Sequence, residues 1–455
     1  MKTRMNFKDE FYQKLKLLVL PIAIQNFMLA LVSATDAIML GWIDQTSLSA
    51  VSLAGQVQFV LSLFISGIAA GAGIMAAQYW GKQDAASIEK VIPIALRTNL
   101  LFSGLFTILA GFCPEMLMRI FTNDAALVAS GSQYLRAVAL SYVLCGISQV
   151  YLILLKNTGH AAVSSRISST AVVLNIILNA ILIYGLCGAP ALGIRGAAYA
   201  TVAARVVELI WAYLETKKPE RVRILWNRLF SSAGKILSED FWRYTLPVLA
   251  ASLVWGIAYV LYSVIMGHMG SDAVAANSIT SIAKSLLSCL IRGVSGGAGV
   301  LIGNLLGADE LEKAREYGGR LTHLAIAIGV VTGGLLMLIS PALVHFAPLT
   351  DTAAEYLQYM LLFCGLNLMA QSVNTTVLDG IFCAGGDAKF DMQGNIGAMW
   401  CFSVPLGFLA AFWLKLPVMV VYCIVNLDEI VKLPAVYLHY KKYVWVRNIT
   451  RDIEE

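Results

Sequence analysis

The sequence is poor in charged residues. Asp, Glu, Lys and Arg make up only 13% of its 455 residues, while 58% are hydrophobic. An average soluble domain carries about 25% charged residues, so this composition argues against a water-soluble protein. The net charge of +5 is modest, and the basic residues are not clustered on one element. We therefore expect no nucleic-acid partner.

Motifs of enzymes and of ATP-driven pumps are also missing. The sequence has no HExxH, no GxSxG and no P-loop, and its five histidines are scattered. The eight cysteines lie inside apolar runs without a CxxC pair, so we interpret them as small hydrophobic residues rather than metal ligands. Residues 1–16 are polar and basic and precede a full-length apolar run, so we expect no cleavable signal peptide. The sequence predicts neither an enzyme nor an organic cofactor.

Long apolar runs are the dominant feature of the chain. Each is long enough to cross a bilayer as a helix, the structure that lipid imposes on a spanning backbone. Most Lys and Arg residues lie in the loops on one side, so the positive-inside rule places both termini in the cytoplasm. We expect a multi-pass monomer in the lipid bilayer of the cell (plasma or inner) membrane. The twelve predicted spans are roughly 15–40, 51–77, 93–113, 131–155, 167–187, 195–214, 242–266, 275–302, 321–343, 354–383, 394–413 and 418–438.

The opening stretch of the chain occurs twice. Residues 21–81 read PIAIQNFMLALVSATDAIMLGWI…GIAAGAGIMAAQYWG, and residues 247–307 read PVLAASLVWGIAYVLYSVIMGHM…GVSGGAGVLIGNLLG, at a constant offset of 247 − 21 = 226. Both copies run from inside to outside, which is typical of transporters built from parallel repeats. We divide the chain into an N-lobe at 1–214, a cytoplasmic linker at 215–241, and a C-lobe at 242–455 that ends in a short cytoplasmic tail.

The first lobe carries one acid within a predicted span. Asp36 lies four residues from the outer end of the first span, where an ionisable side chain is costly and indicates a site. Asn175 and Asn179 share one face of the fifth span, and Thr201 lies at similar depth in the sixth. Their oxygens suit a hard cation such as Na⁺ or a hydrogen-bond network around a protonatable Asp36. Ordinary polar contacts between helices explain the spacing equally well.

The second lobe carries charges near mid-membrane. Lys284 lies in the eighth span, and Asp428 and Glu429 lie in the twelfth. Because unpaired charge is untenable there, we predict that Lys284 pairs with Asp428 or Glu429, and that Asp379 pairs likewise with Arg292. A proton or substrate-cation site is the alternative. Aromatic faces and methionines hold organic cations, and the candidates to line a substrate cavity are Gln25, Phe27, Met28, Trp255, Tyr259 and Tyr262.

Several motifs resemble those of the multidrug and toxic compound extrusion (MATE) transporters, along nearly the whole chain. They are Gln25 with ATDAIMLG (34–41), QYWGKQD (78–84), LKNTGH (155–160), NIILN (175–179), LGIRGAAYAT (192–201), SVIMGHMG (263–270) and GGAGVLIGNLLG (296–307). The resemblance implies an all-α integral membrane fold with twelve transmembrane helices in two pseudo-symmetric six-helix bundles around a central cavity. It also implies efflux of small organic cations and other xenobiotics by alternating access, in exchange for Na⁺ or H⁺.

The resemblance further implies a cation site in the first lobe, with Na⁺ possible at Asp36. Asp36, Asn175, the backbone of Ala197, and Thr201 match the family pattern, whereas Asn179 departs from it because relatives often have Asp there. In the second lobe we hypothesise that Lys284, Asp428 and Glu429 replace the acids that some relatives use. The alternative function is a lipid-linked oligosaccharide or polysaccharide flippase of the same superfamily, although such proteins tend to have a strongly basic cavity and two extra helices.

Overall fold

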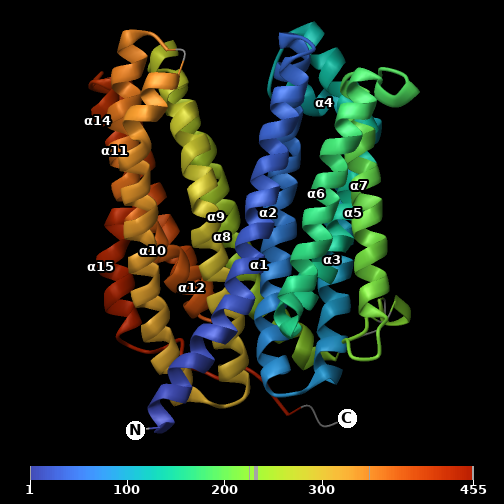
Figure 1. The fold of residues 1–455 in the computed structure, drawn as a ribbon, viewed down its shortest axis with the longest axis vertical. Helices are drawn as coiled ribbons and strands as arrows, with labels where there is room; N and C mark the ends of the chain where they lie inside the picture. Colours follow the sequence, from blue (N-terminus) through green and yellow to red (C-terminus); the bar gives the residue numbers. More distant parts are fainter. Residues whose placement is uncertain (1, 225, 230–233, 348, 453–455) are drawn as a thin grey trace. The chain divides into compact units, whose positions relative to one another are not determined.

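The computed structural model describes residues 2–224, 226–229, 234–347 and 349–452, and within these ranges the chain is helical without a β-strand (Figure 1). The elements of the first part are α1 (Lys2–Gly41), α2 (Gln45–Gly81), α3 (Ala85–Phe112), α4 (Pro114–Arg119), α5 (Ala125–Leu155), η1 (Lys156–His160), α6 (Ala161–Tyr184), η2 (Leu186–Gly188), α7 (Ile194–Thr216) and η3 (Trp226–Arg228). Those of the second part are α8 (Lys235–Gly267), α9 (Ser271–Gly307), α10 (Leu311–Phe346), α11 (Asp351–Thr375), η4 (Thr376–Phe382), α12 (Ala388–Asn395), η5 (Ile396–Ser403), α13 (Val404–Phe408), η6 (Leu409–Trp413), α14 (Val418–Val425) and α15 (Asp428–Tyr440).

The helices form two compact units. The N-terminal unit is Phe27–Leu249, in which α5 packs against α2, α3 and α7, and α6 packs against α7. The C-terminal unit joins Met1–Asn26 to Ala250–Asp452, and in it α11 packs against α9, α10 and α15. The helix α1 therefore contributes to both units. The predicted lobes at 1–214 and 242–455, with their linker at 215–241, stay a prediction.

Among the residues that the structure describes, ten helical stretches are long and apolar enough to cross a membrane. One of them, Ala125–Tyr184, contains two of the twelve predicted spans and turns at Gly159, where φ is +82°. The last predicted span, 418–438, is interrupted, because α14 ends at Val425 and α15 begins at Asp428. The prediction of an all-α integral membrane fold is confirmed.

The hairpin of α6 and α7 depends on three glycines. Gly185 ends α6 with φ of +74°, and Gly193 precedes α7 with φ of +54°, backbone conformations that glycine adopts without a steric penalty. At Gly196 a Cβ atom would lie 2.4 Å from the carbonyl oxygen of Leu182. The absence of a side chain there lets α7 approach α6 closely, so polar groups on the two helices come within hydrogen-bond distance.

In the C-terminal unit, three helical breaks surround a group of polar side chains. The π-helical turns η4 and η5 begin shortly after Asn374 and Asn395, respectively. The third break separates α14 from α15 and places Asp428 and Glu429 in the first turn of α15. Such irregular turns are frequent at functional sites because they leave backbone and side-chain groups free for other contacts.

Candidate cation site

The side chains of the predicted first-lobe site form a continuous hydrogen-bonded chain in the N-terminal unit. Asn179 of α6 is fully buried, and its Nδ2 donates to Oδ1 of Asp36 on α1 and to Oδ1 of Asn175 at 3.2 Å. Asn175 in turn donates from Nδ2 to Oγ1 of Thr201 on α7, also at 3.2 Å. The Thr201 hydroxyl donates to the backbone oxygen of Ala197 at 3.0 Å. The structure thus brings all five predicted residues together.

Helical spacing explains this chain. Asn175 and Asn179 lie four residues apart, as do Ala197 and Thr201, so each pair occupies one face of its helix. The hydroxyl of Tyr184 also donates to the backbone oxygen of Met39 at 2.6 Å, which ties the end of α1 to α6. Three helices therefore hold the polar groups in place.

The donor and acceptor balance of the chain leaves an oxygen available for a cation. Oδ1 of Asn179 is buried and accepts no hydrogen bond among the described residues. Buried acceptors in folded proteins are nearly always paired, so an unpaired one calls for a specific ligand. With the carboxylate of Asp36 and the hydroxyl of Thr201, this oxygen gives a hard-oxygen set of one negative charge, which matches a monovalent cation. Cation binding by this set stays a prediction.

The prediction for Lys284 is wrong. Its ammonium donates to Oδ1 of Asn367 at 2.8 Å, and no ion pair joins it to Asp428 or Glu429 among the described residues. The cation beside these acids is Lys432, with its Nζ 3.0 Å from Oε1 of Glu429 and 3.8 Å from Oδ2 of Asp428. Lys432 was not among the predicted site residues, although its spacing of three residues from Glu429 and four from Asp428 predicts this pairing within one helix.

The expected pairing of Asp379 with Arg292 is also wrong. Asp379 lies in η4 and Arg292 in α9, both side chains are exposed, and no ion pair within the described chain joins them. An ion pair depends on the direction in which each side chain leaves its helix, which the sequence alone does not give. Asp379 therefore presents an accessible carboxylate within an otherwise apolar segment.

Comparison with known proteins shows the family. The family model MatE matches residues 21–181 and again residues 247–409. The two matches begin at Pro21 and Pro247, where the sequence repeat begins, and together they cover most of the chain. The chain belongs to the MATE family of transporters.

Its relatives match at low identity over nearly their whole length. The uncharacterized transporter YisQ of Bacillus subtilis is 21% identical over 94% of this chain and 93% of its own. The probable multidrug resistance protein YoeA of the same organism is 21% identical, with coverage of 99% and 98%. The probable multidrug resistance protein NorM of Thermotoga maritima is 24% identical, with coverage of 90% and 87%.

Solved structures share the fold. An outward-facing multidrug resistance MATE family transporter of the MOP superfamily has a TM-score of 0.85 at 19% identity, with 95% of each chain covered. The Vibrio cholerae MATE transporter VcmN has a TM-score of 0.87 at 15% identity, with coverage of 96% and 99%. The MATE fold is thus retained at identities that by themselves say little about substrate or coupling ion.

The six residues predicted to line a substrate cavity of this MATE protein lie in both units. Gln25, Trp255, Tyr259 and Tyr262 belong to the C-terminal unit, whereas Phe27 and Met28 belong to the N-terminal unit. Trp255 and Tyr259 stack with ring centroids 5.5 Å apart, and Tyr259 is 44% exposed, so this pair offers an accessible aromatic face. A substrate cavity lined by all six residues remains a prediction.

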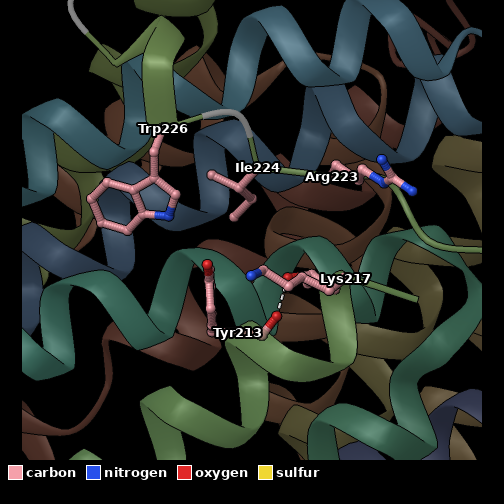
Figure 2. A pocket seen from close by; sticks show the side chains of 6 residues that line it. Tyr213, Lys217, Arg223, Ile224 and Trp226 are labelled. Atoms are coloured by element: carbon pink, nitrogen blue, oxygen red, sulfur yellow. Dashed lines mark hydrogen bonds between the residues drawn. The ribbon is translucent and has the colours of Figure 1, made fainter. Parts of the chain in front are cut away.

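A surface pocket of about 290 Å³ lies at the far end of α7, lined by Tyr213, Thr216, Lys217, Arg223, Ile224 and Trp226. In Figure 2, Trp226 and Ile224 lie across this pocket from Tyr213 and Lys217. Thr216 follows Thr201 by fifteen residues on the same helix, a separation of about 22 Å at 1.5 Å per residue. The pocket is therefore separate from the candidate cation site.

Proposed function

We propose that this MATE protein is a secondary active multidrug efflux antiporter that exports small organic cations in exchange for Na⁺ or H⁺. Its family and the names of the relatives YoeA and NorM support drug efflux. The observation that carries the coupling proposal is the hydrogen-bonded chain from Asp36 through Asn179 and Asn175 to Thr201. The protein acts as a monomer in the plasma or inner membrane with both termini in the cytoplasm, in line with the distribution of Lys and Arg.

The arriving ion acts on the hydrogen bond between Asn179 and Asp36. A Na⁺ bound at the carboxylate repels the Nδ2 protons of Asn179 and attracts its unpaired Oδ1, so the amide reverses. A proton on Asp36 has the same effect, because the carboxylic acid becomes a donor and now needs an acceptor. Either ion thus reverses the polarity of the same contact between α1 and α6. Coupling follows if the two states of this contact bind the exported cation differently.

The test measures ethidium efflux from proteoliposomes under a Na⁺ gradient and then under a pH gradient alone. Asp36→Asn is expected to abolish gradient-driven efflux while the protein still folds. Normal gradient-driven efflux by that variant would contradict the proposal.

Asp44→Asn is the matched control. Asp44 caps α2 through Ser47, whose hydroxyl and backbone N–H both donate to the carboxylate at 2.6 Å. The hydrogen bond from the Ser47 hydroxyl, and next that from its backbone N–H, lower the pKa of Asp44. The control therefore removes an ionised carboxylate close in sequence to Asp36. Asn is as good an N-cap as Asp, so efflux by Asp44→Asn should stay normal.

A further inference from the structure

The ammonium of Lys432 is buried in a cage of oxygen atoms in the C-terminal unit. Its Nζ donates to Oε1 of Glu429 at 3.0 Å and to Oδ1 of Asn395 at 3.2 Å, and Oδ2 of Asp428 lies 3.8 Å away. The exposed fraction of each of these residues is 9% or less. We call these three oxygens the Lys432 cage. An amide oxygen and two carboxylates around one positive charge form the ligand set of a hard monovalent cation.

Two of the three cage residues have hydrogen-bond partners other than Lys432. On one side, Nδ2 of Asn374 on α11 donates to Oε2 of Glu429 at 2.8 Å and to the Glu429 backbone oxygen at 2.6 Å. On the other side, Nδ2 of Asn395 donates to Oδ1 of Asp391 at 3.1 Å. Asn374 on α11 and Asp391 on α12 therefore orient Glu429 and Asn395, two of the three cage residues, without the ammonium.

The surroundings hold more acceptors than Lys432 can satisfy. Asp391, Asp428 and Glu429 supply three carboxyl groups in and beside the cage. Oδ1 of Asn374 has no hydrogen-bond partner among the described residues, although this side chain is only 1% exposed. Lys284, the other lysine predicted near mid-membrane, donates to the neutral amide of Asn367. This excess of acceptor oxygens favours a cation.

We propose that the Lys432 cage is a monovalent-cation site whose resident cation is the ammonium of Lys432 itself. The cage is thus permanently filled in the native protein, and removal of the lysine side chain opens it to Na⁺, ammonium or methylammonium. A consequence for transport rests on the proposed function. Because the Lys432 cage is permanently filled, ion exchange takes place only at Asp36, and each chain exchanges one cation in a transport cycle.

The experiment uses the full chain, purified in detergent, with Asp36→Asn as the parent so that the first site is silent. Binding of radioactive Na⁺ and the unfolding temperature are measured with and without Lys432→Ala. We expect the parent to bind no Na⁺ and Lys432→Ala to bind one equivalent. The unfolding temperature of that variant should rise with Na⁺ or methylammonium concentration, since a ligand that binds only the folded state stabilises it. Methylammonium reproduces the end of the missing side chain.

Lys284→Ala in the same parent is the matched control. It also removes a mid-span lysine, but the hydrogen-bond partner of that lysine is a neutral amide and Lys432 still fills the cage, so no cation site should appear. Three results would each overturn the proposal. The two lysine variants bind Na⁺ equally, Lys432→Ala binds no Na⁺, or the parent already binds one equivalent of Na⁺.

A second variant covers the case in which Lys432→Ala does not fold. Removal of one member of a buried ion pair leaves an uncompensated charge, whereas neutralisation of both members is often tolerated. Lys432→Ala with Glu429→Gln should therefore fold without added cation and bind none, while Na⁺ or methylammonium should recover the single variant. A single variant that no cation recovers overturns the proposal, as does a double variant that folds no better. These readouts need no transport, so normal efflux by Asp36→Asn would refute the proposed function and leave the cage unaffected.

Discussion

The close approach of α6 and α7 can be tested at Gly196. In Gly196→Ala the new Cβ atom would lie 2.4 Å from the carbonyl oxygen of Leu182, whereas ordinary contacts begin at 3.4 Å. The helices must therefore separate locally by about 1 Å, the difference between these two distances. Forced overpacking of this kind costs about 1 to 3 kcal/mol. We expect the free energy of unfolding to fall by that amount.

The same displacement acts on the candidate cation site. Thr201 lies five residues after Gly196 on α7, and Asn175 donates to it across the helix pair at 3.2 Å. A shift of about 1 Å takes this distance to about 4 Å, which is no longer a hydrogen bond. A lost hydrogen bond costs about 0.5 to 1.5 kcal/mol, so the cation concentration for half-maximal efflux should rise about two- to tenfold. Efflux from proteoliposomes at graded Na⁺ or proton concentrations measures this.

Gly104→Ala is the matched control, because it adds the same methyl group where the structure places nothing within 4 Å. Alanine in a helix interior is more favourable than glycine by about 0.5 to 1 kcal/mol, so this control should be as stable as the native protein or more stable. If Gly196→Ala matched Gly104→Ala in both unfolding temperature and ion dependence, the argument that close helix packing shapes the site would be refuted.

Two further predictions concern stability in detergent. Glu208→Gln should lower the free energy of unfolding by about 3 to 5 kcal/mol, because the Glu208 side chain is 1% exposed and pairs with Arg205 at 2.6 Å. The control Glu115→Gln at an exposed ion pair should cost less than about 1 kcal/mol, and equal thermal shifts would contradict the reasoning. Trp445→Ala should cost about 3 to 5 kcal/mol and expose the C-terminal tail to protease, since Trp445 is fully buried. The tail should remain resistant in the control Trp413→Ala, where the tryptophan is 83% exposed, and a resistant tail in both would argue against Trp445 as its anchor.

The sequence by itself determined the fold class and most of the first site. Span positions follow from local composition, because a bilayer admits only helices that satisfy their own backbone, and the constant offset of 226 residues needs no three-dimensional information. Asp36, Asn175, Asn179 and Thr201 of the candidate cation site were predictable, because the two asparagines share a helical face and all four were expected at similar depth. Arg205 and Glu208, three residues apart on α7, form an ion pair for the same local reason.

The tertiary structure alone decided which charges meet in the C-terminal unit. The depth of Lys284 and of Glu429 can be estimated from hydropathy. Their contact depends on how each helix is rotated about its axis, and the sequence of a span that is apolar on all sides does not specify this rotation. In the folded protein Lys284 donates to Asn367, and Glu429 pairs with Lys432. The break between α14 and α15, just before Asp428, also depends on the tertiary structure. An interruption that is costly in an isolated helix is compensated by contacts from neighbouring helices.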